Sequence, residues 1–168
     1  MTIGFYIGRF QPFHNGHMSV IKKALEEVDK LIIGIGSAEK CYTKDNPFTT
    51  GERIDMITAA LQEVNPNKYL IIPVRDIDRY GMWVSHVEML CPKFDTVYTG
   101  SPITKMLFEK REGYEIKEVS KVFDFSATEI RMKMLNSEDW QGLLPDSVVE
   151  YLKKMDVEKR IKEVMAKD

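Results

Sequence analysis

Short apolar runs alternate with amphipathic segments along almost the whole chain of 168 residues. Runs with the length and continuity of strands buried on both faces, as in parallel sheets, lie at residues 3–8, 31–36, 69–74, 96–99 and 115–119. Between them, apolar residues recur at helical spacing. Repeated strand–helix units build a doubly wound parallel sheet. The sequence therefore predicts an α/β fold with five parallel strands and helices on both faces.

Two helices have clear starting signals. Thr49 with Glu52, and Ser126 with Glu129, each fit a capping box, in which the first side chain and the fourth satisfy each other's backbone N–H groups. The polar stretch 37–47 has no periodicity and is expected to be a long loop. The whole chain, 1–168, is expected to form a single domain, with a helical C-terminal extension over about 137–168.

Composition and charge exclude several classes of protein. Hydrophobic residues make up 43% and charged residues 30%, which is typical of a soluble globular domain. The net charge of -2 argues against a dedicated nucleic-acid binder. No apolar run is long enough to cross a membrane, and no signal peptide is evident. Cys41 and Cys91 are far apart and lack the spacing of a zinc site. A cytoplasmic protein without nucleic-acid or membrane partners is expected.

The stretch 8–17, GRFQPFHNGH, joins the first expected strand to the first expected helix. Such a junction presents free backbone N–H groups and the positive end of a helix dipole, which together favour an anion. Arg9, His14 and His17 add positive or hydrogen-bonding side chains, and Gly16 allows a close approach to the backbone. Helix capping, a surface position and metal binding are the alternatives, but the two histidines lack a third metal ligand. The sequence favours phosphate binding.

This stretch resembles the H/T-x-G-H signature of a nucleotidyltransferase superfamily. The second motif of that superfamily is rich in serine and carries an arginine one turn into a helix, and residues 126–131, SATEIR, match it. Both motifs, the chain length, the segment 46–53 and Trp83-Val84 resemble archaeal-type nicotinamide mononucleotide (NMN) adenylyltransferases across nearly the whole chain. The resemblance implies a Rossmann-like fold, ATP and NMN as substrates with Mg²⁺ as cofactor, and a homo-oligomer, in this family often a hexamer.

The resemblance also assigns roles at the phosphates of ATP. It implies that His14 and His17 contact the phosphates, with His17 at the α-phosphate in the transition state. Arg9 would hold the β- or γ-phosphate, and Arg131 would grip the departing pyrophosphate. The alternative for Arg131 is a solvated charge on a helix face.

The remaining ATP contacts are implied in the same way. They are Gly8, Phe10, Gly16, Gly100, Ser101, Ser126 and Thr128. Two of these residues have a simpler explanation that stays open: Gly100 as a turn glycine and Ser126 as a helix cap.

For the acceptor nucleotide, the resemblance implies Trp83 and Asp76. Trp83 would stack on the nicotinamide ring, although a half-buried core position fits its sequence context equally well. Asp76 would accept a hydrogen bond from the carboxamide, or it would cap a turn at the end of the third strand. A magnesium site on Asp76 and Asp78 is the less favoured alternative, because ATP phosphates can hold Mg²⁺ with mostly water ligands. No metal ligand on the protein is predicted.

One position departs from the family pattern. The family tends to carry a basic residue just before the acid-Pro-Phe segment of the long loop, where this chain has Asp45. Lys44 and Lys40 are the candidates to replace that cation.

The expected chemistry requires no covalent catalyst. The acceptor phosphate attacks the α-phosphorus of ATP, and a phosphate monoester is already largely ionised at neutral pH because its second pKa is about 6. Catalysis then depends on positioning and on cationic stabilisation of the leaving group. The alternatives are adenylyl or cytidylyl transfer to another phosphate, such as phosphopantetheine or FMN, and a non-catalytic nucleotide-binding regulator. Retention of all the expected cations argues against a regulator.

Overall fold

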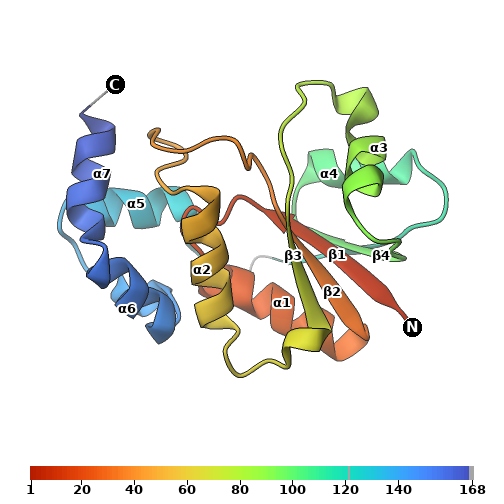
Figure 1. The fold of residues 1–168 in the computed structure, drawn as a ribbon, viewed down its shortest axis with the longest axis horizontal. Helices are drawn as coiled ribbons and strands as arrows, with labels where there is room; N and C mark the ends of the chain where they lie inside the picture. Colours follow the sequence, from red (N-terminus) through yellow and green to blue (C-terminus); the bar gives the residue numbers. More distant parts are fainter. Residues whose placement is uncertain (121, 167–168) are drawn as a thin grey trace.

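The computed structural model describes residues 1–120 and 122–166. Its sheet has five strands in the order β3-β2-β1-β4-β5, and every neighbouring pair is parallel. The strands are β1 (Ile3–Gly8), β2 (Lys30–Ile35), β3 (Tyr69–Pro73), β4 (Thr96–Thr99) and β5 (Glu115–Glu118). The predicted doubly wound, Rossmann-like sheet is confirmed (Figure 1).

Seven α-helices and two short 3₁₀ helices complete the described part of the chain. They are α1 (Asn15–Glu27), α2 (Thr50–Ala60), η1 (Pro66–Lys68), α3 (Tyr80–Leu90), α4 (Pro102–Glu109), α5 (Ala127–Leu135), η2 (Gln141–Leu143), α6 (Asp146–Lys154) and α7 (Val157–Met165). Both expected capping boxes are present, at the start of α2 and of α5. None of the described helices is both long and apolar enough to cross a membrane.

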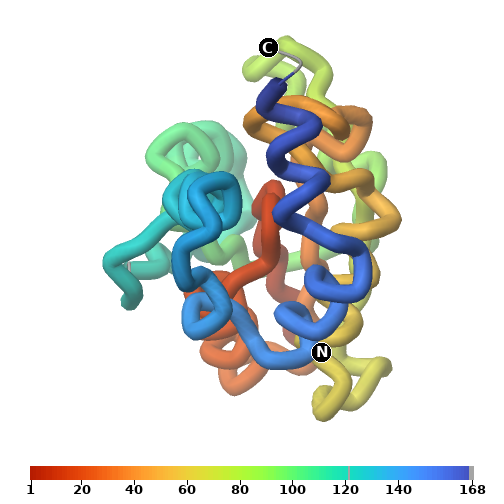
Figure 2. The backbone as a smooth tube through the Cα atoms, turned by 90° about the vertical axis from the view of Figure 1, so that its left-hand side faces the viewer, coloured from red at the N-terminus to blue at the C-terminus, as the bar shows by residue number. Residues whose placement is uncertain are grey.

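The helices cover the sheet on both faces, as predicted. One face packs α3 and α4 against the sheet through residues such as Phe5, Val87 and Phe108. The other face carries α1 and α2, and its core extends into α5, α6 and α7. The helical extension was expected over about 137–168, of which 167–168 lie outside the described residues. Figure 2 looks onto this layer, with α6 and α7 in blue.

The strand order fixes where a ligand can sit. The chain begins at the centre of the sheet with β1, adds β2 and β3 on one side, and then crosses to β4 on the other side. In open parallel sheets, a crevice forms where the strand order reverses, at the carboxyl ends of the strands. Here that point lies beyond the ends of β1 and β4. The loop 8–17 and the glycine at position 100 follow these two strands directly.

Candidate active site

A cavity of about 500 Å³ opens at this crevice, within the size range of small-molecule sites. It brings together most of the predicted ATP-binding residues: Arg9, Phe10, His14, Gly16, His17, Gly100, Ser126 and Arg131. The other lining residues are Tyr6, Gln11, Val20, Val119, Ser120, Val122, Phe123, Phe125 and Ala127. The cavity is therefore built from segments that are distant in sequence: the β1–α1 loop, the end of β4, and the stretch from β5 into α5.

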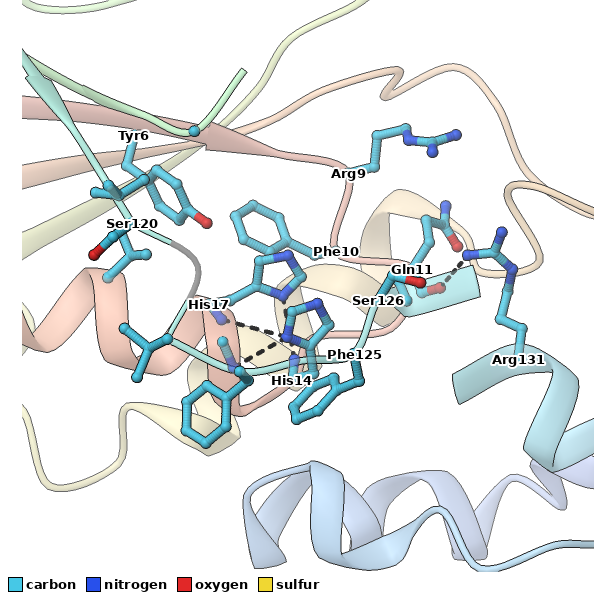
Figure 3. A pocket seen from close by; sticks show the side chains of 17 residues that line it. Tyr6, Arg9, Phe10, Gln11, His14, His17, Ser120, Phe125, Ser126 and Arg131 are labelled. Carbon is cyan, nitrogen blue, oxygen red and sulfur yellow. Dashed lines mark hydrogen bonds between the residues drawn. The ribbon is translucent and has the colours of Figure 1, made fainter. Parts of the chain in front are cut away.

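The cavity has different chemistry at its two ends (Figure 3). Tyr6 and Ser120 lie at one end, and His14 and His17 lie in the middle. Arg9 and the Arg131 side chain lie at the opposite end, together with Gln11 and Ser126. A ligand with a flat apolar group at one end and several negative charges at the other would match the two ends of this cavity.

His14 and His17 form a reciprocal cap at the start of α1. The Nδ1 atom of His14 accepts the backbone N–H groups of Gly16 at 3.1 Å and of His17 at 3.4 Å. In return, the Nδ1 atom of His17 accepts the backbone N–H of His14 at 3.2 Å. The rings stack with centroids 3.6 Å apart. The capping alternative from the sequence is thus realised, and it leaves the other ring nitrogens unused by the cap.

This cap fixes the tautomer of both imidazoles. Because each Nδ1 atom accepts a backbone N–H, the proton of each neutral ring must be on Nε2. An Nε2–H group can donate to a phosphate oxygen but cannot take up a proton. Both histidines are therefore arranged as neutral hydrogen-bond donors and not as general bases.

Burial keeps the two rings neutral. It lowers the pKa of His14 from an ordinary 6.5 to about 4. Burial, with a smaller contribution from the neighbouring His14, holds the pKa of His17 well below 6.5. The rings of Phe10 and Phe13 enclose His17, at centroid distances of 4.7 Å and 5.5 Å. At neutral pH the positive charge in the site therefore comes from arginines.

Gly16 and Gly8 both make room for aromatic rings of the same loop. A Cβ atom at Gly16 would lie 2.9 Å from the His14 ring, and one at Gly8 would lie 3.0 Å from the Phe10 ring. Phe10 itself has a positive φ of 52°, which turns the chain sharply after β1. The glycine at position 16 thus allows the His14 ring to reach back over the helix N-terminus.

Arg131 is buried, with only 2% of its surface exposed, so the alternative of a solvated helix-face charge is wrong. Its Nη1 donates to the Gln11 carbonyl at 2.9 Å and its Nη2 to the Thr128 hydroxyl at 3.3 Å. Its Nε has no hydrogen-bond partner in residues 1–120 and 122–166. The guanidinium is therefore held rigidly while one buried N–H remains available. Burial, and then the charge of Arg9, lower the pKa of Arg131.

Asp45, the residue that departs from the family pattern, lies beside Arg131. Asp45 Oδ1 is 3.5 Å from Arg131 Nη2, and the Asp45 side chain is 70% exposed. A carboxylate from the loop between β2 and α2 thus lies beside the same guanidinium that was predicted to hold pyrophosphate.

Some predicted ATP-binding residues do not line the cavity. Gly8 contacts Phe10, Thr128 contacts Arg131, and Ser101 caps α4 by accepting the N–H of Thr104 at 3.3 Å. Ser126 both caps α5 and lines the cavity, so capping is confirmed and the contact with ATP stays a prediction.

Sequence reasoning missed several lining residues. Gln11 is 1% exposed and forms a pair of hydrogen bonds with the backbone of Phe48, at 3.0 Å and 2.9 Å. It thereby ties the long loop to the histidine-bearing loop. Phe123 and Phe125 form an aromatic wall, with the Phe125 ring edge-on to His14 at 5.4 Å. The signal for this wall was in the sequence, since both phenylalanines directly precede the second motif.

A second, smaller cavity of about 290 Å³ contains the predicted acceptor residues, Asp76 and Trp83. The other lining residues are Ser37, Lys40, Ile77, Asp78, Arg79 and Tyr80. Trp83 packs its ring edge-to-face with Phe108, with centroids 5.9 Å apart, while also lining the cavity. The half-buried packing position is thus observed, and stacking on the nicotinamide ring stays a prediction that the cavity position permits.

Asp76 is already engaged in the structure. Its Oδ2 accepts from the Ser37 hydroxyl at 2.9 Å and from Lys40 Nζ at 2.8 Å. Partial burial raises the pKa of this carboxyl, but the hydrogen bonds from Lys40 and Ser37 outweigh burial, and the net pKa is lowered. Lys40 therefore lies at the smaller cavity, whereas Lys44 forms no ion pair with the described residues.

No group of three or more histidine, cysteine, aspartate or glutamate side chains converges on a potential metal site among the described residues. The polar side chains that line the larger cavity carry guanidinium, imidazole, amide and hydroxyl groups. These groups suit phosphate oxygens better than a hard cation. The residues therefore fit a metal that arrives on phosphate oxygens and not one held in a protein cage.

Comparison with known proteins extends these findings. Residues 5–133 match the family model described as cytidylyltransferase-like. Nicotinamide-nucleotide adenylyltransferase of Methanococcus aeolicus is 49% identical over 96% of this chain and 94% of its own length. The enzymes of that name from Haloarcula marismortui and Archaeoglobus fulgidus are 46% and 44% identical, over 98% of this chain and 88% and 98% of their own lengths.

Among solved structures, the chain resembles a bifunctional NMN adenylyltransferase/ADP ribose pyrophosphatase from Francisella tularensis, solved with AMP and a manganese ion. The TM-score is 0.79 at 25% identity, and the match covers 98% of this chain but only 52% of that protein. The near-complete matches to the archaeal enzymes confirm the family expected from the two motifs. This chain belongs to the nicotinamide-nucleotide adenylyltransferases of the cytidylyltransferase-like family.

Proposed function

We propose that this enzyme transfers the adenylyl group of ATP to NMN, forming NAD and pyrophosphate, with the two cavities holding the two substrates. The observation that carries the proposal is the order of groups in the larger cavity: aromatic and apolar residues, then two imidazole donors, then two guanidiniums. This order matches adenosine, α-phosphate, and β- and γ-phosphates. Its position at the strand-order reversal agrees with nucleotide binding in similar sheets.

In the proposed reaction, an oxygen of the NMN phosphate forms a bond to the α-phosphorus of ATP. The bond between the α-phosphorus and the bridging oxygen to the β-phosphorus breaks, and pyrophosphate leaves with that electron pair. No proton has to be removed from the nucleophile, because the phosphate monoester is largely ionised at neutral pH. The fixed tautomers of His14 and His17 agree with this, because both rings can only donate.

The histidines and arginines have separate roles in this proposal. His17, the more deeply enclosed of the two rings, donates its Nε2–H to the α-phosphate oxygens as negative charge builds up there. His14 donates beside it. Arg9 and Arg131 hold the β- and γ-phosphates and stabilise the departing pyrophosphate. Since both imidazoles are neutral, the arginines supply the charge that opposes repulsion between the two substrates.

ATP is proposed to enter as its magnesium complex. Such a metal would supply positive charge to the triphosphate and would need mostly water and phosphate ligands, while Arg9 and Arg131 would hold the remaining phosphate oxygens. The scarcity of carboxylates around the larger cavity supports this arrangement, since a dedicated protein site would need several.

The acceptor is proposed to lie in the smaller cavity, with Trp83 against the nicotinamide ring and Asp76 near its carboxamide. Asp76 is bound to Lys40 and Ser37, which fix the position of its carboxylate. Nicotinic acid mononucleotide is proposed as a second acceptor, because a carboxylate in place of the carboxamide can pair with Lys40. The homo-oligomeric state and the cytoplasmic location stay predictions, and the mass of the purified protein in solution tests the first.

The deciding experiment measures pyrophosphate release by the purified protein with ATP and Mg²⁺. NMN, nicotinic acid mononucleotide, phosphopantetheine and FMN are offered as acceptors, and CTP replaces ATP in a parallel series. Release with NMN and ATP, together with formation of NAD, is expected. Release only with phosphopantetheine, with FMN or with CTP would refute the proposed substrates, while leaving the nucleotidyltransferase chemistry in place.

A further inference from the structure

Arg53 on α2 is completely buried, and its guanidinium lies in a ring of backbone carbonyl oxygens. Its nitrogens donate to the carbonyls of Arg9, Gly36, Ser37, Ala38, Lys40 and Thr49, at distances from 2.9 Å to 3.3 Å. One nitrogen also donates to the Thr50 hydroxyl at 3.2 Å. No carboxylate forms an ion pair with this arginine among the described residues. Such a buried, unneutralised charge needs a specific explanation.

The carbonyls around Arg53 come from the loops that build the two cavities. The carbonyl of Arg9 belongs to the β1–α1 loop, whose side chains line the larger cavity. The carbonyls of Ser37 and Lys40 belong to the loop after β2, and the side chains of these same residues hold Asp76 in the smaller cavity. A single rigid side chain thus fixes the backbone of both loops.

Arginine suits this position in a way that lysine does not. Its planar guanidinium presents five N–H donors in a fixed fork, whereas a lysine ammonium presents three donors from one point. The Arg53 acceptors lie on different sides of the group and are contacted by Nε, Nη1 and Nη2 separately. A lysine at this position would leave several of these carbonyls without a donor.

Arg53 also carries its charge close to Arg9. Burial lowers its pKa, but the group stays protonated because an arginine titrates far above neutral pH. Arg9 is close enough to contribute to lowering the pKa of both Arg53 and Arg131. Of these three guanidiniums, those of Arg9 and Arg131 line the larger cavity, whereas that of Arg53 lies behind the loop that carries Arg9.

We infer that Arg53 is a positioning residue for adenylyl transfer, which sets the separation between the triphosphate in the larger cavity and the acceptor in the smaller one. This inference rests on the proposed function. In-line transfer needs the reacting atoms about 3–3.5 Å apart, and a misplacement of about 1 Å costs about 10²-fold in rate. Binding of ATP alone or of NMN alone depends on one cavity. The reaction and the binding of the dinucleotide product depend on both cavities.

The test is Arg53→Lys, with Met56→Ala as the matched control. Met56 is on the same helix and fully buried, but it belongs to the core beneath the sheet. For Arg53→Lys we expect kcat to fall about 10- to 100-fold, with KM for ATP and for NMN each within about threefold of wild type. The Kd of NAD is expected to rise at least about tenfold, while the Kd values of ATP alone and NMN alone change less than about threefold. The control is expected to lose stability but to keep kcat and the Kd of NAD within about threefold.

An unchanged kcat and an unchanged Kd of NAD in folded Arg53→Lys would overturn the inference. The inference would also be overturned if the fall in kcat of Arg53→Lys were no larger than that of Met56→Ala. If Arg53→Lys does not fold, Thr50→Val decides, because it removes one hydroxyl that contacts Arg53 and donates to the Ala38 carbonyl. That variant is expected to lose about three- to tenfold in kcat at unchanged KM, and an unchanged kcat would refute the inference. Failure of the wild-type protein to form NAD would instead refute the proposed function.

Discussion

Acidification is expected to destabilise this protein through the histidine cap of α1. At neutral pH both imidazoles are neutral, and each accepts a backbone N–H through Nδ1. A proton added to Nδ1 removes that acceptor and places a charge in a site already flanked by Arg9 and Arg131. The low pKa values of the two histidines thus keep the cap formed at neutral pH.

The size and sign of the effect follow from His14. Its pKa in the folded protein is about 4, below an ordinary 6.5. Between these two pH values the unfolded chain binds more protons than the folded one, so stability falls as the pH falls. The contribution is present in full above pH 6.5 and is lost progressively towards pH 4. A shift of this size corresponds to about 3 kcal/mol of unfolding free energy at about 1.4 kcal/mol per unit.

The assay is urea unfolding followed by fluorescence at several pH values between 7.5 and 4.5, for the wild type and for His14→Asn. Asparagine is a good helix N-cap that does not titrate in this range. Protonation of carboxylates is common to both proteins, so the difference between their pH profiles reports on His14 together with its smaller effect on the pKa of His17. We expect the wild type to lose about 2 kcal/mol more than the variant over this range. Parallel profiles would refute the neutral histidine cap.

Three further substitutions test the site. His17→Ala is expected to lower kcat by about 10²-fold or more with a smaller change in KM for ATP, measured by steady-state kinetics, because it removes a donor to the transition state. Gly16→Ala is expected to change the unfolding free energy by less than about 1 kcal/mol but to lower kcat at least about tenfold, since its Cβ displaces the His14 ring. Asp45→Asn is expected to lower KM for ATP about two- to fivefold, because the exposed carboxylate no longer competes for Arg131; an unchanged KM would show that Asp45 does not compete.

Much of the fold could be predicted because its signals are local. Strand runs, helical spacing and the capping boxes at Thr49 and Ser126 each depend on a few neighbouring residues, and the structure confirms them. Helix ends were less predictable. Apolar residues at helical spacing from Ile54 to Val64 predict a helix that Asn65-Pro66 stops, but α2 ends at Ala60. A turn closed by the N–H of Val64 and the carbonyl of Leu61 then carries the chain into η1.

Residues of the site could be predicted only where a sequence motif specifies both the residue type and its position. The histidine pair and Arg131 carry recognisable spacing, and the structure brings them to one cavity. The role of Arg53 has no such signature, because its partners are backbone carbonyls that any residue can supply. The contact of Asp45 with Arg131 and the hydrogen bonds of Gln11 to Phe48 also depend on tertiary packing.

The hydrogen bond from Arg131 to the Gln11 carbonyl joins residues 120 positions apart. A nascent chain emerging from the ribosome exposes the histidine loop early, but it cannot complete the arginine-bearing end of the cavity until α5 has been synthesised. Contacts of such long sequence separation form late, because the closure of a large loop comes before any gain from the contact. Until then, the buried donors and carbonyls at this end stay hydrated. The arginine-bearing end of the cavity therefore cannot be complete before α5 is present.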